Sequence, residues 1–266
     1  MVRVDPREVL TRTADGPDAV VRYADHPDGV IDVFCPPRGA AAGPLVVLLH
    51  GGFWRVGWDR VHVRPMANGL VAEGCTVVVP EYRRVGGQGE RAGGWPATFD
   101  DVRAVLADLT GLLAKAGLEP AGGDLVVAGH SAGGHLALWL AAEGLPMTRA
   151  VGLAPVGDLR AAARDRLGDD AVVALLGGKP ADVPDRYAAA DPAALLTDRA
   201  GCDLVVVHGT GDTKVPVGNS RGLVERHPFV ELRELPGIEH FGLIDPLSAA
   251  WPTVLSAVRG RQGAPR

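Results

Sequence analysis

Two of the four serines in the sequence lie in the pattern Gly-x-Ser-x-Gly, which surrounds the nucleophilic hydroxyl in one large class of enzymes. This pattern works where a strand enters a sharp turn and a helix leaves it, because the turn then raises the hydroxyl above a sheet. In GHSAG (129–133), LVVAG runs into Ser131 and AGGHLALWLAA runs out of it, whereas no strand precedes Ser220 in GNSRG (218–222). We therefore predict that Ser131 is a nucleophile, which is compatible with capping the next helix, and that Ser220 is a solvated helix residue.

The proton acceptor for such a serine should be an imidazole. A serine hydroxyl is a weak nucleophile unless an imidazole takes its proton and a carboxylate orients that imidazole. On a strand–turn–helix framework of this kind, the chain order is serine, acid, histidine. His240 comes last in that order, in a loop between the final predicted strand and helix, so we predict that it is the base. The other histidines are expected in other roles. They are expected in a turn, on surface helices, at strand ends as supports, and packed underneath on the same helix that follows the nucleophile (His26; His62 and His227; His50, His130 and His208; His135).

Two aspartates compete for the role of the orienting carboxylate. Asp212 follows LVVVHGTG at the end of a buried strand and precedes Thr-Lys-Val-Pro. Asp158 follows the preceding strand and is the rival, while Asp245 is too close to His240 in sequence to be its partner. The order of the chain and the glycine-flanked turn favour Asp212.

The negatively charged oxygen of an acyl-transfer intermediate needs backbone N–H donors. We expect one from Ala132, next to the nucleophile, and others from Gly51, Gly52 and Phe53, which follow an apolar strand. Trp54, Trp58 and His130 are predicted to contact the substrate. The alternative for the aromatic residues Phe53, Trp54 and Trp58 is that they pack this loop onto a neighbouring segment, and the sequence leaves both possibilities open.

The elements that would position these residues alternate between short β-rich runs and helical stretches, which predicts an α/β fold with a mostly parallel sheet of about eight strands, covered by helices on both faces. The irregular segment 156–201 is predicted to be a small cap inserted into one domain that spans 1–266. Strands are expected at 19–23 and 29–34 (an antiparallel hairpin), 45–50, 76–79, 125–128, 150–153, 204–208 and 230–235, and helices at 61–72, 98–116, 132–143, 217–226 and 246–259. The glycine-rich segment 83–95 is expected to be a mobile loop near the cleft.

Composition excludes several classes of protein. The formal net charge is −5 and the basic residues form no block, so neither nucleic acid nor a membrane surface is an expected partner. Nothing in the sequence predicts a cofactor or a metal site. Cys35, Cys75 and Cys202 are widely spaced and odd in number, which favours reduced thiols. Residues 1–6 lack a signal-peptide core, and we expect a cytoplasmic protein, monomeric or homodimeric.

The segments discussed above resemble the α/β-hydrolase superfamily over nearly the whole chain. They are HGGFW (50–54), GHSAGGHLAL (129–138), HGTGDTKVP (208–216) and EHFGLID (239–245), and RYAAADP (186–192) is similar to the segment leading out of the cap in small esterases. Within the superfamily, HGGFW most resembles the HGGYW-like loop of the kynurenine formamidase (arylformamidase) group. Phe53 stands where that group has tyrosine, and it also departs from the HGGG of hormone-sensitive-lipase-like esterases.

The resemblance implies a serine hydrolase that cleaves a formyl-amide of an aromatic amine through an acyl-enzyme on Ser131. The alternative is a broad carboxylesterase acting on short acyl esters, so the expected partner is a small ester or formyl-amide. A third hypothesis is a non-catalytic binder with the same fold, which the presence of all three predicted catalytic residues disfavours. A peptidase is disfavoured because the chain lacks a large accessory domain.

Overall fold

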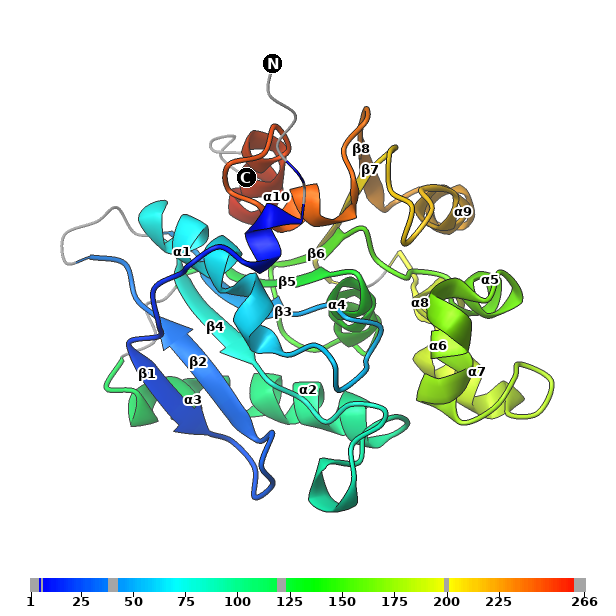
Figure 1. The fold of residues 1–266 in the computed structure, drawn as a ribbon, viewed down its shortest axis with the longest axis horizontal. Helices are drawn as coiled ribbons and strands as arrows, with labels where there is room; N and C mark the ends of the chain where they lie inside the picture. Colours follow the sequence, from blue (N-terminus) through cyan, green and yellow to red (C-terminus); the bar gives the residue numbers. More distant parts are fainter. Residues whose placement is uncertain (1–4, 6, 38–42, 119–122, 199–200, 261–266) are drawn as a thin grey trace.

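The computed structural model describes residues 5, 7–37, 43–118, 123–198 and 201–260. Two predictions fall partly outside these ranges. They concern residues 1–4 and 6, in the stretch considered for a signal peptide, and residues 199–200 of the predicted cap. The described residues form one eight-stranded sheet (Figure 1). Its strands are β1 (Ala19–Arg22), β2 (Val30–Phe34), β3 (Leu45–Leu49), β4 (Thr76–Pro80), β5 (Leu125–His130), β6 (Arg149–Leu153), β7 (Asp203–Gly209) and β8 (Glu231–Leu235).

The order of the strands in the sheet is β1-β2-β4-β3-β5-β6-β7-β8. β2 pairs antiparallel with β1 and with β4, and the pairs from β4 to β8 are parallel. The predicted opening hairpin and the predicted mostly parallel sheet are therefore confirmed. Strands β3 to β7 are apolar along nearly their whole length because helices cover both of their faces.

Helices divide between the two faces of the sheet (Figure 1). Apolar side chains of α1 (Arg64–Ala72) and α10 (Trp251–Arg259) pack on one face, and those of α2 (Ala97–Ala107), α3 (Leu109–Lys115), α4 (Ala132–Ala142) and α9 (Gly218–Arg226) pack on the other. α4 is buried from Ala132 to Ala141, so the helix after Ser131 runs through the core. Two predicted helices differ: 98–116 divides at Asp108 into α2 and α3, and the helix expected from 246 begins at Trp251.

In the described part of the predicted cap, four short helices lie between β6 and β7. They are α5 (Leu159–Arg164), α6 (Leu167–Leu176), α7 (Pro184–Ala190) and α8 (Pro192–Leu195). Gly168, Asp169 and Asp170 have left-handed backbone angles at the start of α6. A Cβ on Gly168 would come within 2.7 Å of the Phe53 ring, so glycine there lets the cap approach the loop after β3. The cap is thus packed onto that loop.

The segment 83–95 is the glycine-rich loop that was predicted to be mobile and to lie near the cleft. It contains a short 3₁₀ helix, η3 (Gly89–Arg91), and isolated bridges join Arg84 to Ala92 and Val85 to Arg55. Ion pairs from Arg84 and Arg91 to the buried Asp28 hold it against the turn between β1 and β2. The segment is therefore tied to its surroundings, and it does not line the pocket described below.

Candidate active site

Ser131 lies at the turn between β5 and α4, at the carboxyl edge of the sheet. Its backbone angles, φ 56° and ψ −115°, are unusual for a residue with a side chain and match the strained turn that raises a nucleophile. Small neighbours make the turn possible, since a Cβ on Gly129 would lie 2.1 Å from the Gly133 carbonyl oxygen, and one on Gly133 would lie 2.1 Å from that of Leu49. The strand–turn–helix context predicted for Ser131 is present.

His240 begins a 3₁₀ helix, η4 (His240–Ile244), and Asp212 lies in the turn after β7. His240 Nδ1 donates to Asp212 Oδ2 over 2.6 Å, and both side chains are nearly fully buried. Asp212 Oδ1 accepts from the backbone N–H groups of Lys214 (2.8 Å) and Val215 (2.9 Å). Burial alone would raise the pKa of Asp212, but hydrogen bonds from His208 and His240 hold it well below its ordinary value. The ionised carboxylate is therefore fixed behind the imidazole.

The two rival aspartates are engaged elsewhere. Asp158 caps α5 by accepting from the backbone N–H of Ala161 over 2.7 Å, and it pairs with Arg226. Asp245 forms a bidentate pair with Arg12. Of these carboxylates, Asp212 is the one that contacts His240.

The loop after β3 runs beside Ser131. A Cβ on Gly51 would lie 3.2 Å from the Ser131 Cβ, and one on Gly52 would overlap Trp58. Gly52, Phe53 and Trp54 have positive φ angles of 108°, 51° and 56°. Within the described residues, the N–H groups of Gly51, Gly52 and Phe53, all three predicted as donors, donate no backbone hydrogen bond. These N–H groups are therefore open to bind an anionic oxygen near Ser131, together with that of Ala132 at the first position of α4.

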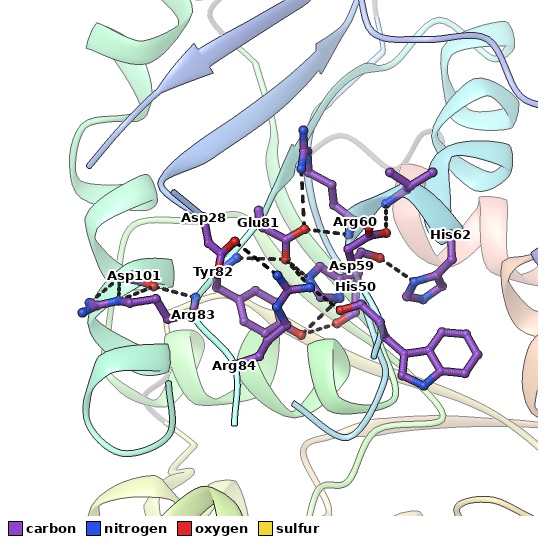
Figure 2. A network of polar contacts seen from close by, with 12 residues as sticks. Asp28, His50, Asp59, Arg60, His62, Glu81, Tyr82, Arg83, Arg84 and Asp101 are labelled. Carbon is purple, nitrogen blue, oxygen red and sulfur yellow. Dashed lines mark hydrogen bonds and ion pairs between the residues drawn. The ribbon is translucent and has the colours of Figure 1, made fainter. Parts of the chain in front are cut away.

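A buried polar network lies beneath this loop (Figure 2). Glu81 Oε1 accepts from His50 Nε2 over 2.8 Å and lies 3.2 Å from Arg84, while Glu81 Oε2 accepts from the backbone N–H of Arg60 over 3.1 Å. Burial raises the pKa of Glu81, but His50 and Arg84 outweigh it and bring the pKa to about 2. The Tyr82 hydroxyl donates to the His50 carbonyl oxygen (2.8 Å), and the Tyr82 ring stacks on that of His50. His50 thus supports the loop, as predicted for a histidine at a strand end.

Ser131 and His240 line the same cavity, of about 190 Å³. Its wall is mostly aromatic, with a few polar side chains, and it consists of Gly52, Phe53, Trp58, His62, His130, Ser131, Lys214, His240 and Phe241. Of the predicted substrate contacts, Trp58 and His130 are among them, and so is Phe53, which was predicted for the oxyanion hole. His130 is buried, and its Nε2 donates to the backbone oxygen of His240 over 3.1 Å, so it also supports the base. Burial, with the nearby His240, holds the pKa of His130 well below its ordinary value.

The predicted substrate contact of Trp54 needs correction. Its side chain is fully buried in the core, where its ring meets that of His135 edge-on with centroids 5.1 Å apart, and it does not line the cavity. The positive φ angles at Phe53 and Trp54 turn the two neighbouring side chains in different directions. Both of the possibilities considered for the aromatic residues therefore occur: Trp54 packs the loop, and Trp58 lines the cavity. Phe53 does both, because it also contacts the cap at Gly168.

Sequence reasoning missed three residues of the cavity wall. His62 lies on the 3₁₀ helix η2 (Arg60–Val63), and burial, with a further contribution from His50, lowers its pKa to about 3. Its ring meets that of Trp58 edge-on with centroids 5.1 Å apart, and because Trp58 lies in the loop before η2, helical spacing gave no signal for this pair. Phe241 stacks on Trp58 with centroids 6.0 Å apart. Lys214 is exposed and adds a cation to the wall.

The structure also tests the predictions made for three polar residues, His135, His227 and Ser220. His135 is buried on α4, the helix that follows the nucleophile, as expected, and its Nε2 contacts the Ala190 carbonyl oxygen over 2.9 Å. His227 and Ser220 were predicted to be at the surface, which is wrong. His227 packs against the cap and bonds to the Ala193 carbonyl oxygen, and Ser220 is fully buried. The Asn219-Ser220 pair lies three to four positions before the buried Leu223, a spacing that places all of them on the inner face of α9.

Among the described residues, no group of three or more histidine, cysteine or acidic side chains could hold a metal ion. In the same part of the chain, no helix combines the length and the apolar character needed to cross a bilayer. The three cysteines are free thiols, and Cys75 is buried.

Comparison with known proteins places this geometry in a family. The model of the BD-FAE family matches residues 31–226, which is most of the chain and includes Ser131 and Asp212. The chain belongs to the BD-FAE family. The same chain is 34% identical over 129 residues to a Mycobacterium tuberculosis protein named as an acetyl-hydrolase, LipR. That match spans 47% of this BD-FAE protein and 38% of LipR.

Solved structures share the fold of this BD-FAE protein. A truncated carbohydrate esterase from gut microbiota is 18% identical, with a TM-score of 0.73 over 91% of this chain and 97% of that one. Esterase B from Lactobacillus rhamnosis, bound to a C4-C4 sn3 tributyrin phosphonate, is 18% identical, with a TM-score of 0.75 over 94% and 87%. The predicted α/β-hydrolase fold is confirmed, and the esterase names agree with the prediction of a hydrolytic enzyme. The narrower resemblance to the arylformamidase group stays a prediction.

Proposed function

We propose that this protein is a serine carboxylesterase that cleaves short acyl esters. The observation that carries the proposal is the 2.6 Å contact between His240 and Asp212 in a cavity whose wall also holds Ser131 on its strained turn. Serine, imidazole and carboxylate in that relation form the apparatus for acyl transfer. The names of the relatives, acetyl-hydrolase and esterase, favour an ester over a formyl-amide.

In the proposed reaction, Ser131 Oγ attacks the acyl carbon and His240 Nε2 takes its proton. The N–H groups of Gly52, Phe53 and Ala132 stabilise the oxyanion, with Gly51 allowing the loop to pass close to Ser131. His240 then protonates the departing alcohol, which leaves an acyl group on Ser131. A water that gives its proton to His240 hydrolyses this acyl-enzyme and restores the hydroxyl. Asp212 keeps the Nδ1–H of His240 in place throughout.

The size of the cavity supports a short acyl group. Its volume of about 190 Å³ is below the roughly 300–1,000 Å³ of sites that hold drug-sized ligands. Its aromatic wall offers stacking surface for a flat leaving group, which is the feature that keeps an arylformamidase as the second candidate.

The test compares kcat/KM for p-nitrophenyl esters of two to eight acyl carbons with that for N-formylkynurenine, with Ser131→Ala as the control. We expect the acetyl and propionyl esters to be the best substrates and the variant to lose nearly all turnover. A preference for N-formylkynurenine over every ester would replace the esterase with the formamidase. Unchanged turnover by Ser131→Ala would remove both.

A further inference from the structure

The second Gly-x-Ser-x-Gly segment, 218–222, has no part in the proposed reaction, yet its serine is fully buried. Ser220 Oγ lies 2.7 Å from His208 Nδ1. His208, near the end of β7, is also fully buried, and neither side chain lines the cavity. A buried hydroxyl and a buried imidazole in contact must satisfy each other, because a polar group without a partner is costly in the interior.

The hydrogen-bond partners determine which nitrogen of His208 carries the proton. His208 Nε2 lies 2.8 Å from the carbonyl oxygen of Val215, which can only accept, so Nε2 carries a hydrogen. In the neutral imidazole Nδ1 is then the acceptor, and the hydroxyl of Ser220 donates to it. The Val215 carbonyl thus fixes the tautomer, and the hydrogen bond donated by Ser220 satisfies the Nδ1 lone pair that this tautomer leaves.

The Nε2 of His208 also lies 3.4 Å from Asp212 Oδ2, the oxygen that accepts from His240. The two imidazoles therefore contact the same carboxylate oxygen, and the backbone N–H groups of Lys214 and Val215 hold the other one. His208 in the opposite tautomer would present a lone pair to the carboxylate and to the Val215 carbonyl, and both contacts would become repulsive.

We propose that Ser220 and His208 are positioning residues for the catalytic acid: the Ser220 hydroxyl donates to Nδ1 and holds the His208 ring in place, and this ring, with its Nε2–H bonded to Val215, keeps its Nε2 edge beside the Asp212 Oδ2 that accepts from His240. This proposal rests on the proposed function of Asp212 and His240. It also accounts for a buried serine on the inner face of α9, where an apolar residue would otherwise fill the space between helix and sheet.

The direct test is the protonation of the His208 ring, measured by two-bond ¹H–¹⁵N correlation NMR on the ¹⁵N-labelled, unmutated protein. We expect the chemical shifts of a protonated Nε2 and an unprotonated, hydrogen-bonded Nδ1 at neutral pH. A protonated Nδ1, alone or together with Nε2, would overturn the proposal, because Ser220 would then accept from His208 and would not donate to Nδ1.

The second test is kinetic and uses Ser220→Ala, Ser220→Thr and the control Ser256→Ala, which removes a hydroxyl from the exposed side of α10. We expect Ser220→Ala to lower kcat by about ten-fold or more, the effect of one misplaced hydrogen bond to a charged group. KM should stay nearly constant, and Ser220→Thr, which keeps the hydroxyl, should recover part of the loss. The downfield proton resonance of His240 Nδ1–H should move in Ser220→Ala and stay in place in Ser256→Ala.

Failure of this proposal and failure of the proposed function are distinguishable. A Ser220→Ala enzyme with the kcat and the His240 resonance of the unmutated protein, beside an inactive Ser131→Ala, would overturn the positioning role and leave the esterase standing. An active Ser131→Ala would overturn the esterase instead. If Ser220→Ala does not fold, the NMR measurement on the unmutated protein decides.

Discussion

The change Glu81→Gln tests the charged network beneath the loop after β3. It keeps the shape of the side chain but removes the carboxylate that accepts from His50 and faces Arg60 and Arg84 (Figure 2). The pKa of Glu81 falls from 4.5 to about 2 in the folded protein. At 1.36 kcal/mol for each pKa unit, this corresponds to a stabilising contribution of about 3 kcal/mol at neutral pH.

The sign of this contribution fixes its pH dependence. Because the pKa of Glu81 is lower in the folded state, the contribution is complete above pH 4.5 or so and is lost as the pH falls toward 2. The difference in unfolding free energy between the unmutated protein and Glu81→Gln should therefore shrink by about 1 kcal/mol between pH 5 and pH 3.5. We also expect a lower kcat, since His50 directly precedes the N–H groups proposed to bind the oxyanion.

The assay is reversible urea unfolding at both pH values, with Glu143→Gln as the matched control. Glu143 pairs with Arg103, and the exposed fractions of their side chains are 32% and 40%. Loss of such a pair should cost less than about 1 kcal/mol. Equal stability of the two variants at neutral pH, or a difference that does not change with pH, would refute the role assigned to Glu81.

The remaining predictions concern the acid, two tryptophans and a buried histidine. Asp212→Asn should lower kcat by about 10³–10⁴-fold, because the imidazole of His240 would lose its orientation. Asp158→Asn, a variant in the cap, should show little change in steady-state kinetics, and the reverse result would exchange the roles of the two aspartates. Trp54→Ala should lower the unfolding free energy by about 3–5 kcal/mol, whereas Trp58→Ala should chiefly raise KM for aryl esters. Similar losses of stability in both variants would contradict the placement of Trp54 in the core and Trp58 in the cavity wall. Burial lowers the pKa of His135 to about 4, so its stabilising contribution is present above pH 6.5 and is lost as the pH falls toward 4. In His135→Phe, the unfolding free energy should therefore change less with pH over this range. An unchanged pH dependence would contradict this.

Much of the site was predictable because it depends on chain order and on the ends of parallel strands. Ser131, Asp212 and the loop at Gly51 each follow a run of buried apolar residues, and parallel neighbours bring those ends to one edge of the sheet. Asp158 could be set aside only with the structure, where its carboxylate caps α5 and does not face His240.

The misplaced residues share a physical cause. The direction of the Trp54 side chain depends on positive φ angles at Phe53 and Trp54, which residue types alone do not indicate. The burial of Ser220 and His227 depends on how α9 lies against the sheet and the cap, and polar residues on a helix are ordinarily read as exposed. Tertiary packing decided each of these positions.

The most direct test of the account is covalent labelling of the folded protein with a fluorophosphonate, followed by mass spectrometry of its peptides. We predict a single adduct on Ser131, formed much more slowly in His240→Ala and absent in Ser131→Ala. Ester hydrolysis that continues with Ser131 unlabelled, or an adduct on Ser220 in its place, would contradict the assignment of the nucleophile.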